Sequence, residues 1–378
     1  MNIVLAPDSF KGSLTAIEAT SIMKKAILSL NKEDTIIEKP MADGGEGTVD
    51  ALLAATKGKK IPINCTGPLG KKIATYYCIT PEQTAIIEVA NIAGLTQVPN
   101  NKRNPNNTTT YGLGEVIIDA LGRNCNTFII GLGGSATNDG GLGMLLALGM
   151  KAFCKNGKEI CKFGRDLLEI EQIDLSGLDP RLKHASIKVA CDVENPLTGE
   201  KGASAVYGPQ KGLTPSQITQ YDHALSRFSR LMESITNSDG LYKTPGAGAA
   251  GGLGFSLLIL GAKLLSGAKL IGEASHIHDA VQQADLVITG EGLSDEQTLY
   301  GKAPGYIADV AKQYHVPVVL ISGGLKGDLN PLLEKFSACF SIANKPLTVE
   351  ECMEQAETLL YSQIKQVVRL AHMIKGIH

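Results

Sequence analysis

The segment FIIGLGGSATNDGGLGMLLALG, residues 128–149, sets the pattern of the fold. Its apolar start, residues 128–130, is typical of a buried strand, and the apolar run that begins at Leu142 is typical of a helix. Seven glycines fall between Gly131 and Gly149. Glycine lets backbone N–H groups approach a ligand closely, and a helix N-terminus favours negative charge. The segment therefore predicts a strand, a glycine turn and a helix, with an anion such as a phosphate bound at the turn.

The turn also contains polar side chains that can bind a phosphate or its metal ion. They are Ser135, Thr137, Asn138 and Asp139. The alternative is that the glycines only let the helix pack closely on the sheet. The polar side chains favour a binding function over packing alone.

Length and composition restrict the class of protein. A chain of 378 residues with 43% hydrophobic and 20% charged residues suggests two ordinary globular domains. Its net charge is −2, without a basic block. Nucleic acid and anionic membranes are therefore not expected as partners, and attraction for anions must be local.

The eight cysteines include no C-x-x-C pair, so neither a zinc site nor a disulfide framework is expected. Residues 2–6 have a strand pattern rather than that of a signal peptide. The most apolar later stretch, around residues 255–265, is interrupted by Gly261 and Lys263 and is too short for a membrane span. We expect a cytoplasmic protein.

Both ends of the chain show short apolar runs alternating with helical patterns, which predicts β-α-β units and a parallel sheet. The expected strands are residues 3–6, 36–39, 286–289, 316–321 and 338–343. Thr15 and Glu18 form a capping-box pattern before the first helix, and Pro304 suits the first position of a later one.

The middle of the chain begins differently. Residues 61–65, 73–77 and 84–90 read as neighbouring strands separated by turn residues, which predicts an antiparallel meander. The simplest organisation is an α/β fold of two domains. Residues 1–61 and 277–378 would form a parallel α/β domain, and residues 62–276 an inserted second α/β domain.

Several polar loops follow predicted strands, and in open parallel sheets ligands bind beyond the carboxyl ends of the strands. The first loop combines Asp8, Ser9 and Lys11, and the second carries Asp43 and Glu46 among glycines. The third places Glu291, Asp295 and Gln297 in one short segment. Each pattern also occurs in ordinary surface turns.

Asp192 follows the apolar run of residues 187–191, where a carboxylate would be poorly solvated unless it has partners. It is a candidate general base or metal ligand, although an Asp that caps the next turn is about as common. Residues 245–254 form a second small-residue loop, for which a close approach to a nucleotide base or simple packing are both plausible.

The familiar nucleotide-binding motifs are absent from this sequence or incomplete. There is no G-x-x-x-x-G-K-[ST] motif of a P-loop NTPase. Residues 131–136 fit the dinucleotide pattern G-x-G-x-x-[GA], but no strand ending in an acid follows about 20 residues later. His276 and His278 form an isolated pair, which favours a structural role.

Taken together, these segments resemble the bacterial glycerate kinase family of the first type, in order along almost the whole chain. The matching segments are APDSFKGSL (6–14), PMADGGEGT (40–48), TTTYGLGE (108–115), GLGGSATNDGG (131–141), ACDVENPLTG (190–199), YGPQKG (207–212), PGAGAAGGLG (245–254), ADLVITGEG (284–292) and QTLYGKAP (297–304). The family commonly has an arginine where this chain has Leu293, so a cation that could contact a phosphate or a carboxylate is missing.

The resemblance implies transfer of the ATP γ-phosphate to D-glycerate, with the 2-hydroxyl as the acceptor associated with this type. It also implies a flavodoxin-like domain with a second domain inserted. Two domains that close on the substrates would exclude water from the reaction.

On this basis we assign candidate roles. Phosphoryl transfer needs a phosphate cradle, a cation, a base and Mg²⁺ held by oxygen ligands. The cradle is assigned to Gly133, Gly134, Ser135 and Ala136, the cation to Lys11, and the base or hydroxyl-orienting group to Asp192. Substrate binding is assigned to Asp8, Ser9, Asp43 and Gln297, and the metal to Glu291 and Asp295, with Asp8 and Asp43 as competing ligands.

Two other classes stay open at the level of sequence. A nicotinamide oxidoreductase acting on small hydroxy acids would use the same glycine turn, and a sensor would bind a hydroxy acid without turnover. The sequence leaves open the choice between the 2- and 3-hydroxyl, the acceptance of related acids, and a homo-oligomer.

Overall fold

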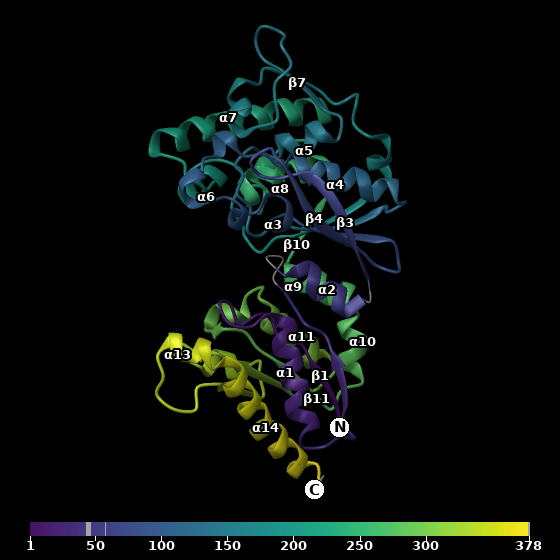
Figure 1. Cartoon of the computed structure of the whole chain (residues 1–378), viewed down its shortest axis with the longest axis vertical. Coiled ribbons are helices and arrows are strands. Elements are labelled where there is room, and N and C mark those ends of the chain that lie inside the picture. Colours follow the sequence, from purple (N-terminus) through teal and green to yellow (C-terminus); the bar gives the residue numbers. More distant parts are fainter. Residues whose placement is uncertain (43–46, 57, 377–378) are drawn as a thin grey trace. The chain divides into compact units, whose positions relative to one another are not determined.

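The computed structural model of the chain describes residues 1–42, 47–56 and 58–376 and forms two compact units. Unit 1 comprises Met1–Asp43, Asp50–Lys57 and Ser266–His378. Unit 2 comprises Gly44–Val49 and Gly58–Leu265. Figure 1 colours the chain along its sequence and shows that both ends belong to unit 1. The domain limits expected from the sequence, at 61/62 and 276/277, stay a prediction.

Unit 1 is built on a five-stranded parallel sheet in the order β15-β13-β11-β1-β2. Its strands are β1 (Asn2–Leu5), β2 (Thr35–Glu38), β11 (Leu286–Thr289), β13 (Val318–Ser322) and β15 (Ala338–Ser341). Counted within the unit, this is the 2-1-3-4-5 order of flavodoxin-like folds. The parallel α/β fold predicted from the two chain ends is confirmed.

Helices flank this sheet and bury its apolar side chains. Those that contain unit 1 residues are α1 (Ala16–Leu28), α2 (Thr48–Thr56), α9 (Gly267–Ala274), α10 (Ile277–Gln282), α11 (Ala303–Gln313), α12 (Asn330–Leu333), α13 (Val349–Glu354) and α14 (Ala356–Ile374). The capping box of Thr15 and Glu18 is present at the start of α1, as predicted. α1 and α14 lie side by side (Figure 1) and share one hydrophobic core.

Unit 2 is built on a six-stranded mixed sheet in the order β10-β9-β6-β5-β4-β3. Its strands are β3 (Lys59–Thr66), β4 (Lys72–Ile79), β5 (Thr84–Glu88), β6 (Thr127–Gly131), β9 (Ser186–Ala190) and β10 (Lys263–Leu265). β3, β4 and β5 pair antiparallel, which confirms the predicted meander, and β5, β6, β9 and β10 pair parallel. A separate antiparallel pair joins β7 (Lys151–Phe153) to β8 (Gln172–Asp174).

The helices of unit 2 cover a large apolar core that includes an edge-to-face pair of Phe228 and Phe255, with ring centroids 6.2 Å apart. They are α3 (Ala90–Ala93), α4 (Tyr111–Gly122), α5 (Leu142–Ala147), α6 (Ala203–Lys211), α7 (Pro215–Thr236) and α8 (Ala249–Ile259). Within the part of the chain that the structure describes, no helix combines the length and apolar character needed to cross a membrane.

Candidate active site

The glycine turn follows β6, as predicted, and its backbone is held by the segment after α3. Leu95 N–H donates to the Gly134 carbonyl and Ala136 N–H donates to the Ala93 carbonyl, each with an N···O distance of 2.8 Å. Gly134 has φ +71°, a left-handed conformation that glycine adopts at little cost. Because the Ala136 amide is already bonded, it is not available for the predicted phosphate cradle.

Three consecutive amides of the turn are available instead. Gly133, Gly134 and Ser135 donate no backbone hydrogen bond to any other residue that the structure describes. Gly133 is half-buried, Gly134 is exposed, and Ser135 is buried. Unpaired backbone N–H groups gathered in one turn form a concave site that favours an anion.

The start of α5 does not offer the anion site that the sequence suggested. The Asp139 carboxylate accepts hydrogen bonds from Thr110 N, Thr110 Oγ1, Gly141 N and Gly143 N at 2.8–3.3 Å. Burial raises the pKa of the Asp139 carboxyl, and these hydrogen bonds oppose that rise. Asp139 therefore closes the first turn of α5 and has a structural role.

The second small-residue loop supports the first one by packing. A Cβ added at Gly251 would lie 2.1 Å from the Thr137 carbonyl oxygen, so a side chain at this position would collide with the glycine turn. Gly140 N–H donates to the Gly251 carbonyl at 2.9 Å, and Ser256 Oγ donates to the Gly140 carbonyl. Of the two alternatives left open for residues 245–254, these contacts favour packing.

The sequence assigned no role to Lys211, which reaches the glycine turn from the last residue of α6. Its Nζ donates to Ser135 Oγ at 2.9 Å and to the Thr137 carbonyl at 2.7 Å. Its side chain is buried, with an exposed fraction of 3%. A lysine before the helix-ending Gly212 has the pattern of an exposed residue at a helix C-terminus, so only its position in the segment YGPQKG could have indicated it.

The same cluster contains polar atoms that lack partners. Thr137 Oγ1 and Asn138 Oδ1 are buried without a hydrogen-bond partner. Asn138 Nδ2 donates to Ser204 Oγ at 2.9 Å. Unsatisfied buried polar groups are uncommon and suggest that a further group completes the cluster.

Asp192 lies near the glycine turn in the sheet order, but its environment differs from the expectation. β6 and β9 are neighbouring parallel strands with Gly131 opposite Ala190, so the turn and Asp192 follow the carboxyl ends of adjacent strands. β9 ends at Ala190, two residues before Asp192, and the Asp192 side chain is exposed. The Asp192 carboxylate is therefore better solvated than its place after an apolar strand suggested, and its role as base or metal ligand stays a prediction.

In unit 1 two predicted loops come together at the point where the strand order reverses. β1 and β11 are neighbouring strands, and Asp8 N–H donates to the Gly290 carbonyl at 2.8 Å. Asp8 is buried, and its Oδ1 accepts from Ser9 N. A Cβ at Gly292 would lie 3.1 Å from Lys11 N, so the two loops are in close contact. Flavodoxin-like folds bind their ligands in this crevice.

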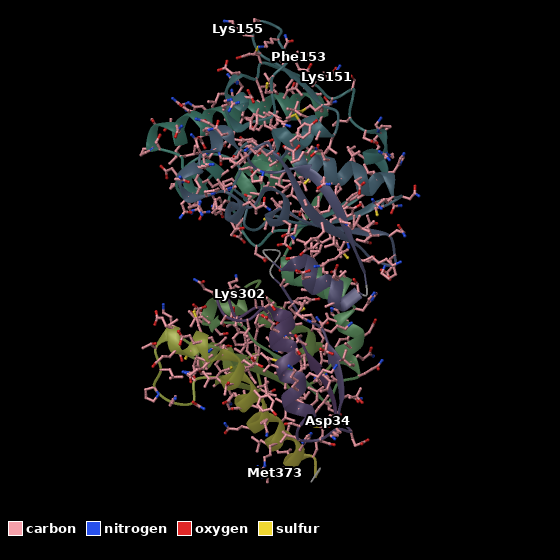
Figure 2. All side chains as sticks on the ribbon, in the orientation of Figure 1. Asp34, Lys151, Phe153, Lys155, Lys302 and Met373 are labelled. Atoms are coloured by element: carbon pink, nitrogen blue, oxygen red, sulfur yellow. The ribbon has the colours of Figure 1, made fainter. Side chains whose placement is uncertain are left out.

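The Glu291 carboxylate contacts three side chains of the segment that follows it in the chain. Its Oε1 accepts from Ser294 Oγ at 3.0 Å and from Thr298 Oγ1 at 2.7 Å. Its Oε2 lies 3.4 Å from the Nζ of Lys302, which is labelled in Figure 2. The loop is fixed further by a short parallel pairing of β12 (Leu293–Ser294) with β14 (Gly324–Leu325).

The remaining predicted residues are less enclosed. Asp295 is half-buried and its Oδ1 accepts from Gln297 N at 2.9 Å, which caps a short 3-10 helix, Glu296–Leu299. The side chain of Gln297 is exposed. Leu293 has an exposed fraction of 51%. Asp43 lies outside the described residues.

The described residues contain no cluster of three His, Cys, Asp or Glu side chains that could hold a metal ion. Mg²⁺ in kinases is commonly held by one or two carboxylates together with substrate phosphates. Asp8 and Glu291 lie on adjoining loops of unit 1, and their carboxylates offer only oxygen atoms as ligands. The donor set therefore fits Mg²⁺ brought by a nucleotide.

Comparison with known proteins gives a consistent result. A model of the glycerate kinase family matches residues 3–372. The glycerate 2-kinase of Escherichia coli is 44% identical over 94% of each chain. The glycerate kinase of Halalkalibacterium halodurans is also 44% identical, over 97% of each chain. A crystal structure of a candidate glycerate kinase 2 from Salmonella typhimurium LT2 matches with a TM-score of 0.90 and 41% identity, covering 100% of this chain and 99% of that one. The chain therefore belongs to the glycerate kinase family and is a kinase with an alcohol group as its acceptor.

Proposed function

We propose that the protein transfers the γ-phosphoryl group of ATP to the 2-hydroxyl of D-glycerate, with Mg²⁺, and releases 2-phosphoglycerate and ADP. Membership of the glycerate kinase family supports glycerate as the acceptor. The relative from Escherichia coli that is named glycerate 2-kinase supports the 2-position.

The observation that carries this proposal is the row of free amides in the glycine turn. Phosphoryl transfer asks an enzyme mainly to position the phosphates and to neutralise their charge. Gly133, Gly134 and Ser135 present N–H groups without acceptors in the described chain, directly after a buried strand. Phosphate oxygens would give each of these donors a partner, so we place the ATP phosphates here.

Asp192 is proposed to orient the 2-hydroxyl of glycerate and accept its proton. Its carboxylate follows β9, the strand next to the one that leads into the glycine turn. An exposed carboxylate in the free protein is compatible with this role, because catalytic hydrogen bonds often form only in the substrate complex.

The loops at the strand reversal of unit 1 are proposed to bind glycerate and the metal. Asp8, Ser9 and Gln297, together with Asp43, supply hydrogen bonds to a small polar acid, and Lys11 supplies a cation for its carboxylate or for the transferring group. Glu291 would hold Mg²⁺, with Asp295 or Asp8 completing the protein ligands.

Product identification tests the proposal. With MgATP and D-glycerate, ³¹P NMR should show a phosphate ester on the secondary carbon of glycerate. An ester on the primary carbon would reject the 2-position and keep the kinase. Binding of D-glycerate without any ester would favour a sensor, and a change in NADH fluorescence on binding to the protein would favour an oxidoreductase.

A further inference from the structure

Lys211 is a buried lysine without a counterion among the described residues. Two acceptors contact its Nζ, Ser135 Oγ at 2.9 Å and the Thr137 carbonyl at 2.7 Å, and no third acceptor is found in the described chain. No carboxylate of the described residues lies within 4.0 Å of this atom. Burying an ammonium group without an ion pair is costly, so its presence beside the glycine turn needs an explanation.

Burial and the neighbouring charged groups determine the pKa of the Lys211 side chain. Burial lowers the pKa of Lys211 to about 7, and the Asp139 carboxylate opposes this fall from a distance. The Tyr207 ring, on the same helix, has its centroid 6.0 Å from Nζ. Above pH 7 the ligand-free protein therefore holds Lys211 mainly in its neutral form.

The neighbours of Lys211 connect it to the predicted anion site. The residue that accepts its hydrogen bond, Ser135, is one of the three whose backbone amides are free. A phosphate held by these amides would lie next to a side chain that Lys211 already contacts. In a site of low dielectric, a cation and an anion stabilise one another more strongly than in water.

We propose that Lys211 is the buried cation of the phosphate site, which takes up a proton from solvent when the phosphate chain of a nucleotide binds to Gly133, Gly134 and Ser135. The anion supplies the counterion that Lys211 lacks. Lys211 is a positioning residue, since it contacts the phosphates through Ser135. This inference rests on the proposed use of ATP and adds a specific residue and a linked proton to it.

Calorimetry of MgADP binding to the full chain tests the proposal. At pH 8.0 the binding heat of the wild type, measured in buffers of different ionisation enthalpy, should show net proton uptake, because a lysine whose pKa is lowered to about 7 is mainly neutral at that pH. The Lys211→Met variant should show no proton uptake. It should bind MgADP about tenfold to hundredfold more weakly, as expected for loss of a charged hydrogen-bonding group.

Lys183→Met is the matched control, because it removes an exposed lysine of unit 2 and should keep both the affinity and the proton uptake. Unchanged affinity and proton exchange in Lys211→Met would overturn the proposal. If the Lys211→Met variant does not fold, the binding heats of the wild type in the different buffers test the proposal without it. A binding heat that is the same in every buffer means that no proton is taken up, and it overturns the proposal. Buffer-independent heat in a protein that still phosphorylates glycerate rejects only Lys211. Failure of the wild type to bind MgADP rejects the use of ATP as well.

Discussion

At the scale of single residues, neighbouring polar groups of the glycine turn differ in whether they are available to a ligand or hold the backbone. Ser135 and Asp139 lie four positions apart in the same glycine turn. Ser135 has a free amide and contacts Lys211, whereas the Asp139 carboxylate is used up by four hydrogen bonds. In the sequence both side chains can bind a phosphate or its metal ion, although only Ser135 is assigned to the phosphate cradle.

Replacing Asp192 by Asn should lower kcat by about 100-fold or more, since Asn cannot accept the proton of the 2-hydroxyl. Steady-state kinetics with D-glycerate measures this effect. Glu194→Gln is the control, because Glu194 is also exposed and lies two residues away. Near-normal kcat in Asp192→Asn would remove Asp192 from the role of base.

The lowered pKa of Lys211 predicts how stability depends on pH. Between pH 7 and 10.5 the unfolded chain binds the lysine proton more tightly than the folded protein does, so the free energy of unfolding should rise with pH across this window. Denaturant unfolding of the wild type should show this rise as a difference from Lys211→Met. Equal pH dependence in the two proteins would contradict a lowered pKa.

At the scale of elements, the apolar runs located most strands to within one or two residues. The strand predicted at 286–289 is β11, and that predicted at 3–6 is β1 shifted by one residue. Buried parallel strands are continuous apolar runs, which makes them easy to recognise. The site was harder to predict, because the exposure of Asp192 and the burial of Lys211 depend on contacts between segments far apart in the chain.

Helix capping gives a test at this scale. Thr15→Ala should lower the free energy of unfolding by about 1 kcal/mol, because the Thr15 side chain accepts from Glu18 N at the start of α1. Denaturant unfolding measures the change. Thr15→Ser keeps the hydroxyl and should restore most of the lost stability, and equal stability of the Ala and Ser variants would argue against the cap.

At the scale of the whole molecule, unit 1 joins the two ends of the chain. Asp34 Oδ2 lies 2.7 Å from His372 Nε2, and both side chains are buried. Figure 2 labels Asp34 and also Met373, the residue after His372. This contact joins the segment before β2 to α14, more than 300 residues later in the sequence.

His372→Ala should therefore destabilise the protein by about 1–3 kcal/mol, because it removes a partner from a buried carboxylate. Thermal or denaturant unfolding measures this loss. His276→Ala is the control, since the His276 side chain is 71% exposed, and it should change stability little. Equal stability of the two variants would mean that the contact of Asp34 with His372 contributes nothing.

The family and the class of reaction could be predicted from the sequence, because the matching segments extend along almost the whole chain. The central claim is that the glycine turn of this kinase binds the phosphates of ATP for transfer to D-glycerate. A coupled assay that monitors ADP release from MgATP, with and without D-glycerate, tests this claim. We expect ADP release that depends strongly on D-glycerate. A folded protein that binds D-glycerate but releases no ADP in its presence would not be a glycerate kinase of this mechanism.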